Sequence, residues 1–123
     1  MLLHELFVVV YIIYLHGETK TIGNINYRGY HTSVIWGDIG YTIEPETRGN
    51  HYAYRALCLL SEFLCENGVT DFWITAHVDN IPSNKTIQKY GAHLIKSEDD
   101  VNLYLGETFI RDSDRTNSGG IRL

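Results

Sequence analysis

The stretch IEPETRGNHYAYRALCLL, residues 43–60, changes character halfway along and decides the fold. Its first half is a polar, turn-forming run that ends in Arg-Gly-Asn-His at residues 48–51. Its second half begins an apolar stripe at helical spacing, made of Ala53, Ala56, Leu57, Leu60, Phe63 and Leu64. The period therefore switches from strand to helix here. We predict a helix from about residue 50 to Asn67, with Gly68 as its stop.

A loop that leads directly into a helix is a place where proteins bind phosphate. The helix that begins near Asn50 offers backbone N–H groups and the positive end of its dipole. Gly49 permits a close approach to these groups. A glycine before a helix does not by itself identify a site, because an ordinary turn also contains glycine. The stretch is therefore a candidate anion site with an ordinary turn as the alternative.

Three strands are predicted before this helix. Residues 6–15 are continuously apolar, residues 21–29 are half polar, and residues 33–43 contain Gly37 and Gly40. The two glycines indicate a bulge or a place where something packs close to the backbone. Short connections favour antiparallel pairing of the three strands in a meander.

The rest of the chain predicts a strand, a short helix and a hairpin. The strand covers residues 69–78, and the helix starts near Pro82 and is closed by Gly91. The hairpin covers residues 92–97 and 101–110. The order β-β-β-α-β-α-β-β predicts an α/β (α+β) fold with a mixed, mostly antiparallel sheet and one central β-α-β crossover between parallel strands.

Length and composition indicate one soluble domain over residues 1–112, followed by a flexible tail over residues 113–123 that has few apolar residues to bury. The apolar run at residues 6–15 has no preceding Lys or Arg and is far shorter than the roughly 20 residues that span a bilayer. We therefore expect a buried strand there and no membrane association.

The formal charge of −5 argues against a nucleic-acid surface, because phosphate-backbone binding needs clustered Lys and Arg. Cys58 and Cys65 lie seven residues apart on the predicted helix, roughly 10 Å along its axis, which is too far for a disulfide. Both fall away from the leucine stripe, so neither is expected in the core. Reduced thiols indicate a cytoplasmic protein. The histidines show no metal-ligand spacing, and no metal is expected.

Residues 48–53 now resemble the GNAT superfamily of N-acetyltransferases, whose motif Arg/Gln-x-x-Gly-x-Gly/Ala opens the long central helix. Arg48 and Ala53 match the first and last places, and His51 stands where the pattern has Gly. The preceding DIGYTIEPETRGN is similar to the branch that acetylates ribosomal-protein N-termini. A second motif, NIPSNKTIQKYGAHLI, resembles the family's Asn-x-x-Ser/Ala helix, with Asn80, Ser83 and Gly91 at the expected offsets.

The resemblance covers roughly residues 5–111 and implies acetyl-CoA as the donor. In this fold the strand at residues 38–43 splays from the next strand, and the pantetheine arm lies in the gap. The backbone amides of residues 49–53 would hold the pyrophosphate. The implied cofactor-binding residues are Tyr41, Thr42, Ile43, Arg48, Gly49, Asn50, His51, Tyr52, Ala53, Asn80 and Ser83.

The implied reaction is direct attack of a neutral amine on the thioester, which needs a base and a group that polarises the carbonyl. Asp38 is the first candidate for the base, because relatives often carry a Glu there that works through water, and Glu44 is the second. Ser83 would supply a polar group where the tetrahedral intermediate collapses. A backbone N–H near Tyr41 or Thr42 would polarise the carbonyl.

Two positions depart from the family pattern. Many relatives carry a Tyr acid seven residues after the motif's Asn, where this chain has Ile87, and Tyr90 is too far along the helix to replace it. We expect the thiolate to leave without a dedicated acid. His51 has three interpretations: it is tolerated because a first-turn residue has negative φ, it contacts a phosphate, or it obstructs the donor.

Relatives begin with a strand and one or two helices that form much of the acceptor side, whereas this chain starts at what resembles the second strand. We therefore expect an open acceptor side and an uncovered sheet edge, which a second copy of the chain covers in a homodimer. The leading function is an N-acetyltransferase for a small amine or a peptide N-terminus. The alternatives are a CoA-binding module without turnover and a fragment that binds nothing.

Overall fold

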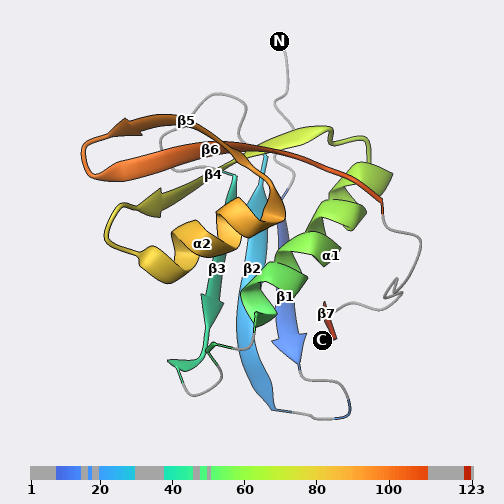
Figure 1. The fold of residues 1–123 in the computed structure, drawn as a ribbon. Helices are drawn as coiled ribbons and strands as arrows, with labels where there is room; N and C mark the ends of the chain where they lie inside the picture. Colours follow the sequence, from blue (N-terminus) through green and yellow to red (C-terminus); the bar gives the residue numbers. More distant parts are fainter. Residues whose placement is uncertain are drawn as a thin grey trace.

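A seven-stranded sheet with two helices on one face forms the protein (Figure 1). The computed structural model describes residues 8–14, 17, 20–29, 38–45, 48–49, 51–110 and 121–122. Its elements are β1 (Val8–Tyr14), β2 (Thr21–Arg28), β3 (Ile39–Ile43), α1 (Tyr52–Glu66), β4 (Asp71–His77), α2 (Ile81–Tyr90), β5 (His93–Glu98), β6 (Val101–Glu107) and β7 (Ile121–Arg122).

The strand order across the sheet is β5-β6-β4-β3-β2-β1-β7. Neighbouring strands are antiparallel except for the β3–β4 and β1–β7 pairs, which are parallel. The predicted meander of three strands and the parallel pairing across α1 are therefore confirmed. The third strand begins at Ile39 in the structure, and the expected part at residues 33–37 lies outside the described residues.

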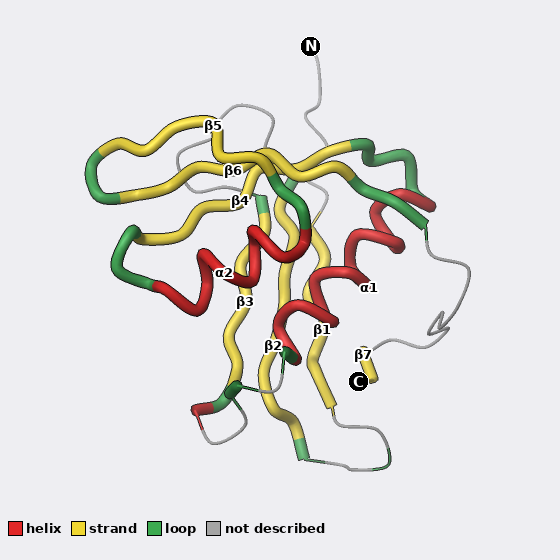
Figure 2. Tube along the Cα trace, in the orientation of Figure 1, coloured by secondary structure: helices red, strands yellow, loops and turns green. Residues whose placement is uncertain are grey.

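The core lies between the sheet and the two helices, which contact each other on the same face (Figure 2). The sheet turns its alternate apolar residues toward α1 and α2, as the period of two in a strand requires. The buried apolar cluster consists of Ile13, Ile22, Ile25, Tyr27, Ile39, Ile43, Ala56, Leu57, Leu60, Leu64, Phe72, Ile74, Ala76, Ile87 and Tyr104.

The opposite face of the sheet is polar in its centre. By the same alternation it carries Asn24, Asn26, Thr42 and Thr75. Both helices of the described part lie on the other face, so neither covers these side chains. The open acceptor side expected from the sequence stays a prediction.

Glycine permits a close backbone approach at Gly23 rather than at the expected glycines. A Cβ on Gly23 would collide with the carbonyl oxygen of Thr42 on the neighbouring strand. At Gly40 a Cβ would meet the Asn26 side chain at 3.5 Å, an ordinary contact. Gly37 lies outside the described residues.

Cys58 corrects the prediction that neither cysteine lies in the core. Its side chain is 4% exposed, and both Cys58 and Cys65 are free thiols. The buried face of α1 is wider than its leucine stripe, because the helix also packs against the end of α2 and β6. Ser61 is fully buried there, hydrogen-bonded to the Tyr90 hydroxyl at 2.5 Å and to the Phe109 amide at 3.2 Å.

The β1 edge of the sheet is paired at its end rather than uncovered. Ile13 and Tyr14 pair in parallel with Ile121 and Arg122 of β7, so the expected uncovered edge is wrong at these two residues. Strand β7 supplies backbone hydrogen-bond partners at this end of β1. The sequence of β1 by itself does not indicate this pairing. Residues 111–120 lie outside the described part, so the flexible tail stays a prediction over residues 113–120, whereas Ile121 and Arg122 are held in a strand.

Candidate functional site

The turn between β3 and α1 passes through left-handed backbone conformations. Gly49 has a φ of +87°, and His51, the N-cap of α1, has φ 60° and ψ 22°. Residues with a Cβ pay about 1–2 kcal/mol in this region, which explains a glycine preference at position 51. Our expectation of a negative φ at His51 is wrong, because His51 precedes the first helical turn. Asn50 lies outside the described residues.

The start of α1 is suited to an anion. The first helical bond from this cap runs from the Arg55 amide to the His51 carbonyl at 3.1 Å, so the amides of Tyr52 and Ala53 have no carbonyl inside the helix to pair with. The first turn carries no acidic residue, and His51 makes no side-chain cap hydrogen bond. The positive end of the helix dipole is therefore not offset by a carboxylate in the first turn of α1.

A gap opens between β3 and β4 just beside this turn. The two strands pair at Ile39 and Ile74, and the Asp38 amide donates to the Trp73 carbonyl at 2.6 Å. Beyond that point β3 stays paired with β2 as far as Ile43 but leaves β4. The predicted splay is confirmed. It leaves a strand edge that an extended ligand can join by backbone hydrogen bonds.

Helix α2 begins on the far side of the gap, where β4 ends. Asn80 is its N-cap, and the Asn80 Oδ1 accepts from the Ser83 amide at 3.2 Å. The Ser83 hydroxyl lies 2.7 Å from the hydroxyl of Tyr41 on β3, so the side chain faces the gap. The physical reason for the Asn-x-x-Ser pattern is therefore a helix cap that also fixes a hydroxyl at the site.

Asn84 locks this helix start to the sheet, and sequence reasoning missed it. Its Nδ2 donates to the carbonyls of His77 and Asn80, both at 2.9 Å, and its Oδ1 accepts from the Tyr104 hydroxyl at 2.6 Å and the Asn102 Nδ2 at 3.0 Å. A buried amide with its donor and acceptor groups engaged fixes both the position and the direction of α2.

A cavity of about 560 Å³ lies between the β3–α1 turn, the start of α1 and the exposed side of α2, within the usual size range of ligand sites. It is lined by Tyr41, Thr42, Ile43, Arg48, Gly49, His51, Tyr52, Ala53, Tyr54, Asn80, Pro82, Ser83, Lys85, Thr86 and Lys89. Ten of the eleven residues predicted to bind the cofactor are therefore brought together. The eleventh is Asn50.

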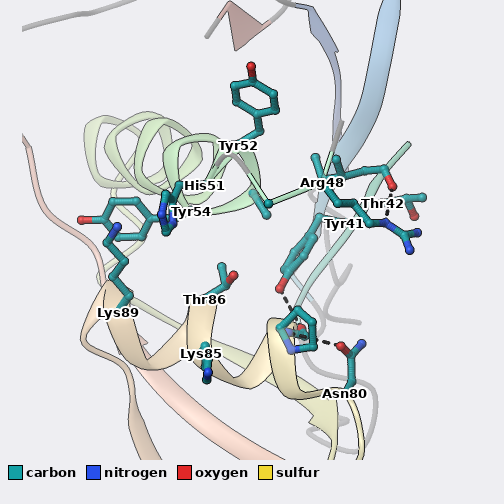
Figure 3. Close-up of a pocket in the computed structure, with 15 residues that line it drawn as sticks. Tyr41, Thr42, Arg48, His51, Tyr52, Tyr54, Asn80, Lys85, Thr86 and Lys89 are labelled. Atoms are coloured by element: carbon teal, nitrogen blue, oxygen red, sulfur yellow. Dashed lines mark hydrogen bonds between the residues drawn. The ribbon is translucent and has the colours of Figure 1, made fainter. Parts of the chain in front are cut away.

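The cavity is cationic although the chain as a whole is acidic. Among the described residues that line it, Arg48, Lys85 and Lys89 carry positive charge, and none is Asp or Glu. Lys89 Nζ lies 4.5 Å from the centroid of the Tyr54 ring, which holds the ammonium at the rim (Figure 3). Arg48 turns back to its own loop, because its Nε donates to the Ile43 carbonyl at 3.0 Å.

Tyr41 reaches across the gap from β3 to α2. Its hydroxyl lies 2.7 Å from the Ser83 hydroxyl, and either group can be the donor. Burial raises the pKa of Tyr41 above 10.0, while hydrogen bonds with Ser83 and Thr86 oppose this rise. The phenol is therefore protonated at neutral pH.

Of the three residues predicted to be catalytic, Ser83 lines the cavity, whereas Asp38 and Glu44 do not. Asp38 is 8% exposed, and its Oδ2 accepts from the Trp73 amide at 2.7 Å at the point where β3 leaves β4. Glu44 is exposed just after β3, and its amide donates to the Ile22 carbonyl at 2.7 Å. Their roles as base stay predictions.

Neither Ile87, at the position of the family's Tyr acid, nor Tyr90 supplies an acid to the cavity, because both are engaged in packing. Ile87 is fully buried in the core. The Tyr90 hydroxyl donates to the Glu107 carbonyl at 2.5 Å and lies 2.5 Å from Ser61 Oγ, so it ties α1, α2 and β6 together away from the cavity.

Four cavity residues on α2 escaped the sequence analysis. Pro82, Lys85, Thr86 and Lys89 line the cavity, and their spacing of three, one and three is that of a single helix face. The signal was present as a polar and basic stripe, but it resembles any solvated helix face. What distinguishes this face is the gap opposite it.

Two features, a helix that could cross a membrane and a cluster of metal ligands, are absent from the described residues. Neither α1 nor α2 is long and apolar enough to cross a membrane. The described residues include no group of three or more His, Cys, Asp or Glu side chains placed to hold a metal ion.

Comparison with known proteins agrees with the fold described above. One solved structure that shares the fold is a domain from Methanocaldococcus jannaschii DSM 2661, with 19% identity and a TM-score of 0.65 over 75% of this chain and 60% of that chain. A second is the microcin C7 self-immunity acetyltransferase MccE in complex with acetyl-CoA and AMP, with 24% identity and a TM-score of 0.60 over 73% of this chain and 56% of that chain. A third is the ribosomal-protein-S5-alanine acetyltransferase from Vibrio fischeri, with 18% identity and a TM-score of 0.59 over 72% of this chain and 55% of that chain.

The chain spans somewhat more than half the length of these structures. A search of the curated proteins found no match. The sequence profile described as acetyltransferase (GNAT) domain matches residues 4–93, which is well over half of the chain. The chain therefore belongs to the acetyltransferase (GNAT) domain family.

Proposed function

We propose that the protein is an acetyl-CoA-dependent N-acetyltransferase that transfers an acetyl group to a primary amine, either a small amine or a peptide N-terminus. The observation that carries the proposal is the cationic cavity, which joins the start of α1 to the gap between β3 and β4. Membership of the GNAT family supports it, as does the acetyl-CoA complex of MccE.

In this proposal the donor's pyrophosphate binds at the amides of residues 49–53, near the cations of α2. The pantetheine arm runs along the edge of β3 that β4 leaves open beyond Ile39. An extended arm with amide groups can form strand-like hydrogen bonds with this edge, and that is the kind of partner the gap admits. The thioester then lies near Asn80 and Ser83.

The proposed reaction is direct attack of the neutral amine on the thioester carbonyl, with the acceptor entering from the open polar face of the sheet. Asp38 is the proposed base, acting through water, because it lies where β3 and β4 part. Glu44 is the second candidate. A backbone N–H of β3 near Tyr41 or Thr42 polarises the carbonyl, and Ser83 stabilises the intermediate.

Two observations favour a CoA-binding module without turnover as the second candidate function. His51 places an imidazole and a left-handed φ where the family pattern has glycine. Ile87 is buried where many relatives carry a Tyr acid. Both candidates keep the donor site and differ only in the transfer step.

The remaining parts of the proposal concern partners and location. We propose a homodimer in which a second copy covers part of the acceptor side, and a cytoplasmic location in keeping with the free thiols of Cys58 and Cys65. Light scattering at micromolar concentration tests the dimer, and a monomer at that concentration contradicts it.

Calorimetric titration of acetyl-CoA, followed by an assay of free thiol release across a panel of amines, tests the function. Binding with amine-dependent thiol release supports the transferase. Binding without such release in any amine favours the CoA-binding module. An absence of binding contradicts both.

The placement of the pyrophosphate has its own test in Gly49→Val. A Cβ at Gly49 meets no protein atom within 4 Å, so the new side chain projects into open space beside the cavity. Gly68→Val is the matched control, because Gly68 has nearly the same φ, +84°, and equally open surroundings at the other end of α1. Acetyl-CoA affinity should fall in Gly49→Val alone. Equal affinities in the two variants would show that the anion site is misplaced.

A further inference from the structure

Tyr41 lies in the stretch that resembles the family branch, but the resemblance assigns its side chain no role in the transfer step. It is the third residue of β3, two residues beyond Ile39, where the strand still pairs with β4. Its side chain crosses the gap, and its hydroxyl lies 2.7 Å from that of Ser83 (Figure 3). A phenol therefore stands inside the opening through which the proposed donor arm passes.

The charges of the cavity indicate which part of the donor reaches this phenol. The cations Lys85 and Lys89 and the start of α1 attract the donor's phosphates. The groups that hydrogen-bond with the Tyr41 hydroxyl are uncharged, namely the hydroxyls of Ser83 and Thr86. The anionic part of the donor is thus held away from Tyr41, and the uncharged thioester arm points toward it.

The leaving sulfur needs a hydrogen-bond donor from the protein at this end of the site. When the carbon–sulfur bond breaks, the electron pair leaves on sulfur, and a thiolate in a partly buried site is unstable without a hydrogen bond. Ile87 is fully buried and has no polar group, and the Tyr90 hydroxyl is engaged with Ser61 and Glu107. Tyr41 is the phenol that lines the cavity at the uncharged end.

Tyr41 is in the right protonation state for this role. Burial raises its pKa, so it keeps its proton at neutral pH and can donate a hydrogen bond. The Ser83 hydroxyl at 2.7 Å accepts that hydrogen bond when no ligand is present and can exchange with a ligand atom.

We propose that Tyr41 is a catalytic residue that donates a hydrogen bond to the sulfur of the donor and stabilises the leaving thiolate. This inference rests on the proposed function. The amine nitrogen forms the new bond to the carbonyl carbon and loses a proton to the base. The carbon–sulfur bond breaks, the electron pair stays on sulfur, and Tyr41 keeps its proton while the thiolate takes one from water on release.

The experiment measures the pKa of the thiol of bound CoA, and it needs no acceptor. Thiolate formation is followed by ultraviolet absorbance during a pH titration of the full-length protein saturated with CoA. The same titration with desulfo-CoA, which lacks the sulfur, subtracts ionisation of the tyrosines. Calorimetry first establishes that each variant binds CoA.

We expect the bound thiol to titrate about one pKa unit higher in Tyr41→Phe than in the wild type, the size expected for one hydrogen bond to a charged group. Tyr90→Phe, which also removes a phenol, should stay close to the wild type, because the Tyr90 hydroxyl is engaged with Ser61 and Glu107 away from the cavity. The charged and titratable groups that face the cavity, Arg48, Lys85, Lys89 and His51, are the same in all three proteins, so their effect cancels.

Equal thiol pKa values in the wild type and Tyr41→Phe, with CoA bound to both, would overturn the inference and leave the proposed function standing. A shift in Tyr90→Phe as large as that in Tyr41→Phe would also overturn it, because the shift would then not come from the phenol inside the cavity. Failure of the wild type to bind CoA would contradict the proposed function itself. A purely structural role for Tyr41 would change stability and not the thiol pKa.

Discussion

His51→Gly should stabilise the protein, because it removes a side chain from a left-handed backbone position. The N-cap of α1 has φ 60°, and this conformation costs a residue with a Cβ about 1–2 kcal/mol. Histidine enters this region more readily than most residues, which favours the lower end of the range. The new glycine also raises the conformational entropy of the unfolded chain, which lowers the free energy of unfolding by about 0.4–1 kcal/mol. Taken from the lower end of about 1 kcal/mol, the net gain is up to roughly 0.6 kcal/mol, about 2–3 °C in Tm for a domain of this size.

Urea and thermal unfolding, followed by circular dichroism, measure this effect. His51→Ala is the control, because alanine keeps the Cβ at the same φ and removes only the imidazole. We expect a gain in the free energy of unfolding for His51→Gly and none for His51→Ala. If His51→Gly proves no more stable than His51→Ala, backbone strain at the N-cap is not the reason for the glycine preference.

The same two variants decide between the interpretations of the imidazole at the exposed wall of the cavity. Weaker acetyl-CoA binding in both variants shows that the imidazole contacts the donor. Tighter binding in both shows that it obstructs the donor. Unchanged affinity shows that the anion site needs only backbone amides at this position.

Three further predictions concern the core network, the cations and the phenol. Asn84→Leu should lower the free energy of unfolding by about 2–4 kcal/mol in urea titration, because it leaves several buried hydrogen-bonding groups without their partner. A loss under about 1 kcal/mol contradicts the role of this amide. The double variant Lys85→Gln and Lys89→Gln should weaken acetyl-CoA binding by roughly tenfold in calorimetry, most strongly at low salt, whereas Lys96→Gln on the exposed β5 should not. Burial raises the pKa of Tyr41, so the stability that the phenol contributes is present below its unfolded pKa of about 10 and is lost as pH rises through its folded pKa. The urea midpoint should therefore fall less above about pH 10 in Tyr41→Phe than in the wild type, and an identical fall contradicts this.

The order of the elements from β1 to β6 could be predicted from the sequence because it depends on local patterns, whereas β7 was not predicted. The apolar period switches from two to 3.6 after residue 50, Gly68 and Gly91 end the two helices, and the short turns require antiparallel neighbours. The family motifs then identified ten of the fifteen cavity residues, since each motif lies on a single turn or helix start. These features are local, so the sequence carries them directly.

Conformations that depend on exact position were predicted less well. His51 was expected inside the first turn, and the structure places it one step earlier, where φ is positive. Helix boundaries are uncertain by one or two residues when they are read from a pattern, and here one residue changes the sign of φ. Cys58 was expected outside the core because a helical wheel shows one stripe and not the second surface that covers α1.

What the tertiary structure alone decided is how distant residues meet. The hydrogen bond between Tyr41 and Ser83 joins residues 42 positions apart, and it exists because β3 leaves β4 while Asn84 holds α2 against the sheet. The cationic face of Lys85 and Lys89 became part of a site only when it faced that gap. The sequence by itself determined the elements, the turn that begins α1 and the family. Long-range packing, which no local period encodes, decided which side chains share the cavity.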